Sequence, residues 1–328
     1  MKTVFVTGGA GFIGSHFCKI ARLNGYNPVT FDNLSTGHKE FVKWGDFIQG
    51  DIHDYNLLIN SFKKYKPMAI FHFAGSIEVG ESVINPYKYY DNNITATVTL
   101  LKAMIENNIK NIIFSSSAAI FGMPDVKVIN ENTKENPINP YGRTKLITEN
   151  ILEDFNKAYG INYTALRYFN ASGADPDCEI GETHEPPNHI IPIVLEKYKK
   201  GEEIKVFGGN WNTRDGTCLR DYIHVNDLAR AHVLALEKMV INNQSQKINL
   251  GTGNGFTVLE VIKNAEKVVN GKIKYKVVER RKGDPESLVC DNKFAREYLN
   301  WNIEFTDIKD HILHMWNWVN KKYDFKCN

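Results

Sequence analysis

The sequence is poor in cysteine, and its few cysteines are not arranged in pairs. Among 328 residues there are five, an odd number, and no two of them form a C-x-x-C motif. They are Cys18, Cys178, Cys218, Cys290 and Cys327. Scattered cysteines of this kind are typical of free thiols in a reducing cytosol rather than of a disulfide framework. We therefore expect a cytoplasmic protein.

Long apolar runs and an excess of charge of one sign are also missing. No run reaches the ~18 apolar residues of a membrane span, and the N-terminal apolar stretch is too short for the core of a signal peptide. The 40 basic and 38 acidic residues leave a formal net charge of +2. This near-balance gives no electrostatic argument for nucleic acid or membrane binding, although it allows local basic clusters around an anionic ligand.

The first half of the chain alternates short β-branched apolar runs with longer helical patterns, which is typical of a parallel doubly wound sheet. The strand-like runs are Thr3–Thr7, Pro28–Phe31, Phe47–Gln49, Met68–Phe73, Asn111–Ser115 and Tyr163–Tyr168. The helical stretches are Gly14–Asn24, Asn56–Lys64, Pro86–Asn107 and Pro140–Tyr159. The pattern predicts an α/β protein with a Rossmann-type sheet, which binds ligands at the carboxyl ends of its strands.

Beyond Asn170 the rhythm changes, and a smaller lobe interwoven with the first is expected. Ala171–Asn188 has the composition of a loop. The elements expected after it are helices at Ile190–Lys200 and Val225–Asn242, strands at Ile204–Phe207 and Lys247–Leu250, and a helix that begins with a capping box at Thr257 and Glu260. We expect residues 1–169 and about 225–255 to form a cofactor domain, and residues 170–224 and 256–328 to form a substrate lobe.

A glycine-rich loop, Gly8-Gly9-Ala10-Gly11-Phe12-Ile13-Gly14, joins the first strand to the first helix. Glycines here permit a tight turn and let the backbone approach a pyrophosphate at the helix N-terminus. A tight turn that merely needs small residues would look the same. Asp32 strengthens the dinucleotide reading, because a carboxylate about 20 residues on can accept both ribose hydroxyls and would repel a 2′-phosphate. The glycine-rich loop and Asp32 together favour NAD over NADP.

Three further segments are candidates for the cofactor site. Asp51-Ile52 follows the third strand and could frame an adenine, although Asp51 fits a turn or helix cap equally well. Phe73-Ala74-Gly75 closes the fourth strand with small residues, as the close passage of a cofactor would require. A second glycine cluster, Gly251 to Gly255, has no acidic partner at the right distance, so we expect a backbone turn there.

Tyr141 and Lys145 lie four positions apart on a helix that Asn139-Pro140 should begin. A free tyrosine titrates near pH ~10 and is a poor base at neutrality. A nearby ammonium, the helix N-terminus and an oxidised nicotinamide would each lower its pKa toward 7. The alternative is a chance pairing on a surface helix. Ser115–Ser117 closes the preceding strand at the same sheet edge, which favours a catalytic group.

These motifs together resemble the extended short-chain dehydrogenase/reductase family and, within it, the UDP-glucose 4-epimerases. The resemblance spans essentially the whole chain. Its markers are Thr7–Gly14, Asp32–Leu34, Ser115–Ala118, Tyr141–Lys145, Arg167–Asn170, Asp215–Thr217, Arg220–Val225 and Arg280–Asp284. It implies an NAD-dependent isomerase that interconverts UDP-glucose and UDP-galactose through a 4-keto sugar. It also implies a homodimer built from long helices beside the catalytic edge.

The resemblance implies a role for individual residues. Ser117 would hydrogen-bond the 4-oxygen of the sugar, Tyr141 would take its proton, and Lys145 would hold the nicotinamide ribose. The residues expected at the NAD site are Gly8, Gly11, Phe12, Ile13, Gly14, Asp32, Asn33, Asp51, Ile52, Phe73, Ala74, Gly75, Asn92, Tyr141, Lys145 and Phe169. Those expected at the UDP-sugar are Ser117, Tyr141, Asn170, His189, Phe207, Arg220, Arg281, Asp284 and Leu288. No metal is expected.

Two departures and two rival functions qualify this picture. Ile77 stands where the family often has a lysine, and Ala119 replaces a frequent threonine.

A 4,6-dehydratase would need carboxylates directly after the active-site hydroxyl, where this chain has Ala118 and Ala119. A non-catalytic NAD sensor would have no need to keep Ser117, Tyr141 and Lys145 together. The sequence leaves open whether N-acetylated UDP-sugars are accepted, a question that we tie to Leu288.

Overall fold

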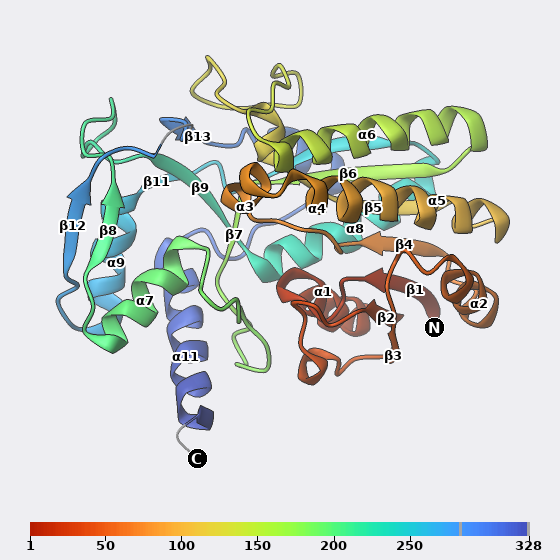
Figure 1. Cartoon of the computed structure of the whole chain (residues 1–328), viewed down its shortest axis with the longest axis horizontal. Coiled ribbons are helices and arrows are strands. Elements are labelled where there is room, and N and C mark those ends of the chain that lie inside the picture. Colours follow the sequence, from red (N-terminus) through yellow and green to blue (C-terminus); the bar gives the residue numbers. More distant parts are fainter. Residues whose placement is uncertain (282–283, 327–328) are drawn as a thin grey trace.

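A seven-stranded parallel sheet forms the centre of the computed structural model, which describes residues 1–281 and 284–326 (Figure 1). The strand order is β3-β2-β1-β4-β5-β6-β10, the Rossmann order with one added strand. The strands are β1 Lys2–Thr7, β2 Tyr26–Asp32, β3 Asp46–Gln49, β4 Ala69–His72, β5 Asn111–Ser117, β6 Asn162–Tyr168 and β10 Gln246–Leu250. The expected α/β fold class is therefore confirmed.

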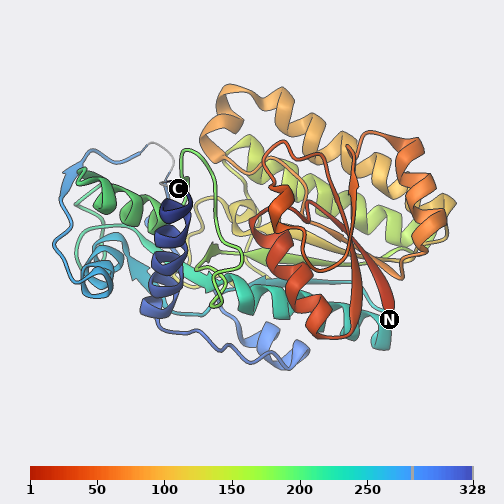
Figure 2. The same cartoon turned by 90° about the horizontal axis from the view of Figure 1, so that it is seen from below.

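Helices cover both faces of this sheet (Figures 1 and 2). On one face α1 (Phe12–Leu23) packs against α8 (Val225–Asn242), with α10 (Lys293–Leu299) beside it. The other face carries α2 (Tyr55–Tyr65), α5 (Ala96–Glu106) and α6 (Pro140–Tyr159). The strands are apolar without alternation because both of their faces are buried; Val4, Phe5 and Val6 of β1 are all fully buried.

The segment expected as one helix over Pro86–Asn107 is interrupted in the structure. It consists of α4 (Pro86–Tyr90), a π-helical turn (Asp91–Thr95) and α5, and a short α3 (Val79–Ile84) precedes it. Asn93 in the π turn is buried and hydrogen-bonded to Ser76 and Thr144. This interior polar contact accompanies the change of helical pitch.

The second lobe contains two small sheets and three helices. In the first sheet, β9 (Leu219–His224) pairs with β7 (Asn170–Ser172), β11 (Gly255–Thr257) and β13 (Ser287–Leu288). In the second sheet, β8 (Ile204–Phe207) pairs with β12 (Tyr275–Val278). The helices of this lobe share one apolar core; they are α7 (Ile190–Lys200), α9 (Val258–Val269) and α11 (Ile308–Lys326). The expected loop over Ala171–Asn188 is thus wrong at its start, because Ala171 and Ser172 belong to β7.

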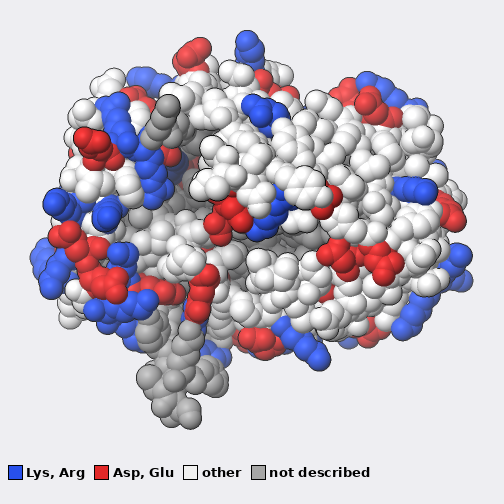
Figure 3. Space-filling view, in the orientation of Figure 1, with Lys and Arg blue, Asp and Glu red and all other residues white. Residues whose placement is uncertain are grey.

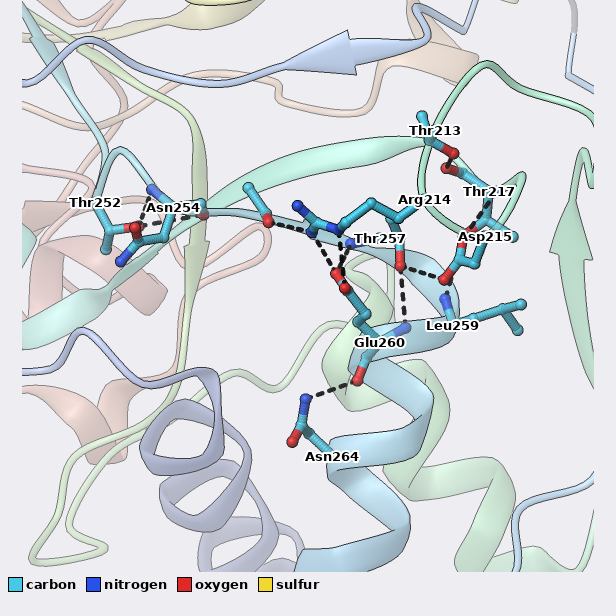
Figure 4. A network of polar contacts seen from close by, with 11 residues as sticks. Thr213, Arg214, Asp215, Thr217, Thr252, Asn254, Thr257, Leu259, Glu260 and Asn264 are labelled. Atoms are coloured by element: carbon cyan, nitrogen blue, oxygen red, sulfur yellow. Dashed lines mark hydrogen bonds and ion pairs between the residues drawn. The ribbon is translucent and has the colours of Figure 1, made fainter.

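The capping box predicted at the start of α9 is confirmed (Figure 4). The Thr257 hydroxyl accepts a hydrogen bond from the Glu260 amide at 3.2 Å, and the Glu260 carboxylate accepts one from the Thr257 amide at 2.9 Å. Arg214 pairs with the same carboxylate, and Asp215 accepts a hydrogen bond from the Thr257 hydroxyl. These contacts fix the loop that leads from β8 into β9.

Within the described residues, no helix combines the length and the apolar character needed to cross a membrane. On the face drawn in Figure 3, basic and acidic side chains lie interspersed, in keeping with a net charge of +2.

Candidate active site

The glycine loop between β1 and α1 leaves no room for side chains. Gly8 has a φ of +71°, and a Cβ there would lie 2.6 Å from the Ala74 amide nitrogen. A Cβ at Gly14 would lie 2.2 Å from the carbonyl oxygen of Gly8. The N-cap of α1, Gly11, offers no side-chain cap, so the first amides of the helix stay free for an anion. This cradle fits a pyrophosphate.

Asp32 closes β2 beside this cradle and is buried. Its carboxylate accepts hydrogen bonds from the amides of Ala10, at 3.0 Å, and Leu34, at 2.8 Å. Burial raises the pKa of Asp32, and these two amides oppose the rise. Each oxygen bonds one amide and can still accept a ribose hydroxyl. The residue types at this edge therefore fit the dinucleotide suggested by the sequence.

Asp51, which the sequence left as either a ligand contact or a turn residue, forms the turn. It accepts hydrogen bonds from the backbone and the ring of His53, and Asn33 donates to it at 2.8 Å. Ile52 beside it is buried in the core under β2. Asn33 and Asp51 thus join the ends of β2 and β3, and their placement does not prevent a further contact with an adenine.

Tyr141, Lys145 and Ser117 meet at the carboxyl edge of the sheet, as the sequence predicts. Asn139 caps α6 by accepting a hydrogen bond from Gly142, with Pro140 in the first turn. Lys145 is buried one turn later, and its ammonium donates to the Ser115 carbonyl at 2.7 Å and lies 5.8 Å from the centre of the Tyr141 ring. Ser117 closes β5 and shares a hydrogen bond with Tyr141.

The electrostatics of this trio differ from the expectation. Burial raises the pKa of the Tyr141 phenol, and the hydrogen bond with Ser117 opposes only part of that rise. Burial also lowers the pKa of Lys145 to about 8, against the charge of Glu149. Without a bound cofactor, the pKa of Tyr141 is therefore raised, although the Lys145 ammonium lies near its ring. A bound oxidised nicotinamide, which is cationic, would act against this rise.

A buried ion pair beneath Lys145 was not identified from the sequence. Glu149 lies one further turn along α6, is fully buried, and accepts hydrogen bonds from Nε and Nη2 of Arg167 in β6. Ser116 donates to it at 2.5 Å. The Tyr-x-x-x-Lys-x-x-x-Glu spacing places these side chains on one face of α6, and that periodicity is the signal that could have revealed Glu149. The pair ties α6 to β5 and β6 under the reactive groups.

The loop after β4 forms a wall directly beside the glycine loop, since a Cβ at Gly8 would meet Ala74. A Cβ at Gly75 would lie 2.9 Å from the Asn93 amide oxygen and 4.0 Å from the Lys145 nitrogen, so this glycine lets a ligand approach Lys145. Asn92, expected at the NAD site, donates to Ser76 at 3.0 Å. Ile77 is 38% exposed, which leaves an apolar surface where the family often has a cation.

The residues expected at the substrate converge from the second lobe. Asn170 of β7 donates to the Asp221 carbonyl of β9 at 2.8 Å. Burial raises the pKa of the Cys218 thiol, with Asp284 acting in the same direction and Arg220 and Arg281 acting against it. Arg281 also lies 3.8 Å from the centre of the Phe207 ring. Lys282 and Gly283 of the expected marker lie outside the described residues.

Contacts between the lobes lie near the site. The rings of Phe12, the first residue of α1, and His189, just before α7, have centroids 6.5 Å apart. Leu288 of β13 packs with Phe169 on the small core cluster that contains Ala118, directly after Ser117. Leu288 is thus partly a packing residue, and it also lies beside the catalytic edge.

Comparisons with known proteins agree along the whole chain. A profile of the NAD dependent epimerase/dehydratase family matches residues 4–251. A UDP-glucose 4-epimerase of Rhizobium meliloti is 47% identical over 322 residues, 98% of each chain. A crystal structure of UDP-glucose 4-epimerase from Brucella ovis in complex with NAD is 46% identical with a TM-score of 0.94, covering 97% of this chain and 98% of that one. A UDP-glucose-4-epimerase from Stenotrophomonas maltophila, with bound NAD and formylated UDP-arabinopyranose, is 35% identical with a TM-score of 0.96, covering 99% and 100%.

Proposed function

The chain belongs to the NAD-dependent epimerase/dehydratase family, and we propose that it interconverts UDP-glucose and UDP-galactose. The observation that carries this proposal is the meeting of Ser117, Tyr141 and Lys145 at the carboxyl edge of a Rossmann sheet, beside a glycine loop that fits a dinucleotide. Inversion at carbon 4 needs no net oxidation, so one resident cofactor suffices.

NAD is the cofactor that these residues fit. Bound there, it would supply a reversible hydride acceptor for carbon 4 of the sugar. The amides at the start of α1 would hold its pyrophosphate, Asp32 its adenosine ribose, and Lys145 its nicotinamide ribose. Asp32 would repel a 2′-phosphate, which disfavours NADP.

The chain's own residues manage the proton of the 4-hydroxyl. Tyr141 as phenolate removes it while carbon 4 is oxidised, and returns it when carbon 4 is reduced. Ser117 shares a hydrogen bond with Tyr141 and is placed to hold the 4-oxygen. Lys145 is held by the Ser115 carbonyl and keeps positive charge beside the phenolate. The same groups serve both directions of the reaction.

A division of labour between the two lobes is part of the proposal. Residues 1–169 and about 225–255 would hold the cofactor, and residues 170–224 and 256–328 the nucleotide. Arg220 and Arg281 suit a diphosphate because arginine donates in bidentate fashion. Both arginines belong to the second lobe and Tyr141 to the first. This separation suits a firm hold on the nucleotide and a loose hold on the sugar, which must turn over between hydride transfers.

A 4,6-dehydratase is disfavoured by the residues that follow Ser117. Elimination of water needs a carboxylate there, but the chain has buried Ala118 and then Ala119, whose amide donates to the Ser117 hydroxyl oxygen. We also propose a cytoplasmic location, supported by the buried free thiols of Cys18, Cys218 and Cys290.

The direct test is to incubate the purified protein with UDP-galactose and no added cofactor. UDP-glucose should form, and heat-denatured protein should release NAD rather than NADP. Formation of a 4-keto-6-deoxy product would instead identify a dehydratase, and no conversion by protein that carries NAD would contradict the proposal.

We expect a homodimer formed by α5 and α6, helices that related enzymes pair into a four-helix bundle. On α5, Val98 is 39% exposed and Ile105 37% exposed, although both are apolar. Light scattering at micromolar concentration should give twice the monomer mass, and Val98→Glu should shift it to the monomer. The control is Ile241→Glu, because Ile241 is exposed at the end of α8 on the opposite face of the sheet. A wild-type monomer would refute the expectation.

We also expect the enzyme to act on UDP-N-acetylglucosamine and UDP-N-acetylgalactosamine. The reason is that Leu288 is smaller than a tyrosine at the same position would be and leaves more room for an N-acetyl group. Alignment on Gly283-Asp284 brings Leu288 to the position where related epimerases place a residue beside the sugar's 2-substituent, and a tyrosine there fills the space that an N-acetyl group would need. Leu288→Tyr should overpack this space, costing ~1–3 kcal/mol or roughly 5- to 150-fold in rate, for the acetylated substrates alone. Leu288→Met, of similar size, should keep both activities. Brisk wild-type turnover of UDP-glucose without any conversion of UDP-N-acetylglucosamine would refute this hypothesis.

A further inference from the structure

A nearly fully buried carboxylate, Glu182, lies in the segment between β7 and α7. One of its oxygens, Oε1, is 2.9 Å from Nδ1 of His189 and 3.2 Å from Nδ1 of His184. The Trp318 indole donates to the Glu182 carbonyl at 3.0 Å, and a Cβ at Gly181 would lie 2.4 Å from that indole ring. The backbone around Glu182 is therefore tightly packed against α11.

Burial of this carboxylate demands compensation by positive charge. Removing a carboxylate from water is costly unless it is paired and hydrogen-bonded. Its second oxygen, Oε2, is buried and has no hydrogen-bond partner within the described residues, so the compensation falls on Oε1 and the two imidazoles. Burial raises the pKa of Glu182, but the charges of His189 and His184 and their hydrogen bonds more than reverse this, to about 2. Glu182 is thus an anion in the interior.

His189 lies where the N-termini of α1 and α7 come close together. It is the N-cap of α7, and its ring lies beside Phe12, the first residue of α1. Neither helix has a side-chain cap hydrogen bond, and the free amides and dipoles of both helices favour an anion there. Since Nδ1 of His189 bonds Glu182, Nε2 is the nitrogen that remains to meet a ligand.

The charge on His189 follows from its neighbours. The ionisable groups that face it are Glu182 and, across Glu182, His184, whose ring centroid lies 6.1 Å away. Burial lowers the pKa of His189, but the charge and hydrogen bond of Glu182 outweigh burial and raise it. An imidazolium is therefore favoured to higher pH than in a free histidine.

We propose that Glu182 is a positioning residue that keeps His189 cationic and aims its Nε2 at the diphosphate of the bound UDP-sugar. The proposal rests on the proposed function, since it assigns the anion that His189 meets. Glu182 touches neither sugar nor cofactor and acts through His189 alone. It explains why an acidic side chain is buried next to a site that must attract a diphosphate: its charge is neutralised by the histidine that it orients.

The test is the dissociation constant of UDP-glucose from pH 5.5 to 8.5, measured in a Tyr141→Phe background to prevent turnover. The diphosphate of a UDP-sugar does not titrate in this range, so a pH dependence reports on the protein. Affinity should fall as the pH rises through a midpoint above ~6.5, the ordinary histidine value. Glu182→Gln should move this midpoint to lower pH and weaken binding at pH 7.5 about tenfold, in the range for loss of one charged hydrogen bond.

Two variants separate this role from a merely structural one. His184→Asn removes the other partner of Glu182 and should leave both affinity and midpoint within threefold and a few tenths of a pH unit. His189→Gln should weaken binding and abolish the pH dependence. Bound NAD and the thermal midpoint report whether each variant is folded, and if Glu182→Gln does not fold, the wild-type and His189→Gln curves decide the question.

Each remaining outcome is decisive. A wild-type midpoint at or below 6.5, or a Glu182→Gln curve that coincides with wild type, overturns the proposal and leaves the epimerase function intact. The ligand atoms of Glu182, His184 and His189 also lie within 4.8 Å of one another. Loss of UDP-glucose affinity with a chelator and recovery with Zn²⁺ would show that they hold a cation, which also overturns it. No binding of UDP-glucose at any pH would instead refute the proposed function.

Discussion

Replacing Tyr141 with phenylalanine should lower turnover by about 10²–10⁴-fold and leave the dissociation constant of UDP-glucose nearly unchanged. The phenol is the group placed to exchange a proton with the 4-hydroxyl, next to Ser117 and Lys145. The ring itself is kept in the variant, so packing and nucleotide binding should persist. Steady-state rates with UDP-galactose, together with binding by calorimetry, measure the two quantities separately.

The matched control is Tyr163→Phe. Tyr163 is a buried tyrosine of β6, but it lies toward the amino end of that strand, opposite Ile112 of β5 and away from the catalytic edge. Its loss of a hydroxyl should change turnover by less than threefold. If Tyr141→Phe retained more than a tenth of the wild-type rate, another group would have to be the base.

The Rossmann sheet could be predicted because its strands bury both faces. Runs such as Val4-Phe5-Val6 and Ile112-Ile113-Phe114 are apolar without interruption, which separates them clearly from the amphipathic helices. The strand β9 gives no such signal. It contains Arg220 and Asp221, and Asp221 is fully buried because it accepts hydrogen bonds from the amides of three residues far along the chain. A buried acid of this kind cannot be told from a loop residue by periodicity.

The interruption of the helix at Asp91–Thr95 was equally hidden. No proline or glycine marks it, and the contacts that accompany it are tertiary: Asn93 bonds Ser76 from the loop after β4 and Thr144 from α6. π-helical turns recur at functional sites, and this one lies under the wall next to Gly75. Only the folded arrangement brings the three segments together.

The candidate site also contains contacts that sequence spacing predicts and contacts that it does not. Tyr141 and Lys145 share a helix, so their spacing alone predicts their proximity. Glu182 pairs with a histidine seven residues further on across an irregular segment, and Arg167 reaches Glu149 from another element. The hydrogen bond from the Lys145 ammonium to the Ser115 carbonyl was also beyond the sequence, and so was the rise that burial causes in the pKa of Tyr141.

The free energy of unfolding should fall steeply when the pH is lowered from 6.5 toward 4. Burial lowers the pKa of His16 to about 4, of His72 to about 3 and of His232 to about 4. In the unfolded chain each binds a proton near pH ~6.5. Between these values the unfolded state holds more protons, so stability is full above 6.5 and declines below it. The three together should cost roughly 4 kcal/mol per pH unit, against a typical total of about 5–15 kcal/mol.

Buried acids whose pKa is raised, among them Asp221 and Asp32, oppose this decline. Burial raises the pKa of Asp221 to about 6, so its protonation favours the folded state as the pH falls below 6, and it offsets about one of the three histidines. Urea unfolding at pH 7.5, 6.5 and 5.5 should therefore show little change in the first step and a loss of a few kcal/mol in the second. His72→Gln removes one titrating group from between Thr7 and Thr97 and should reduce the loss of unfolding free energy between pH 6.5 and 5.5. His38→Gln, at a partly exposed position, should leave this loss unchanged. Equal unfolding free energies at pH 6.5 and 5.5 in the wild type would show that these histidines are already protonated in the folded protein.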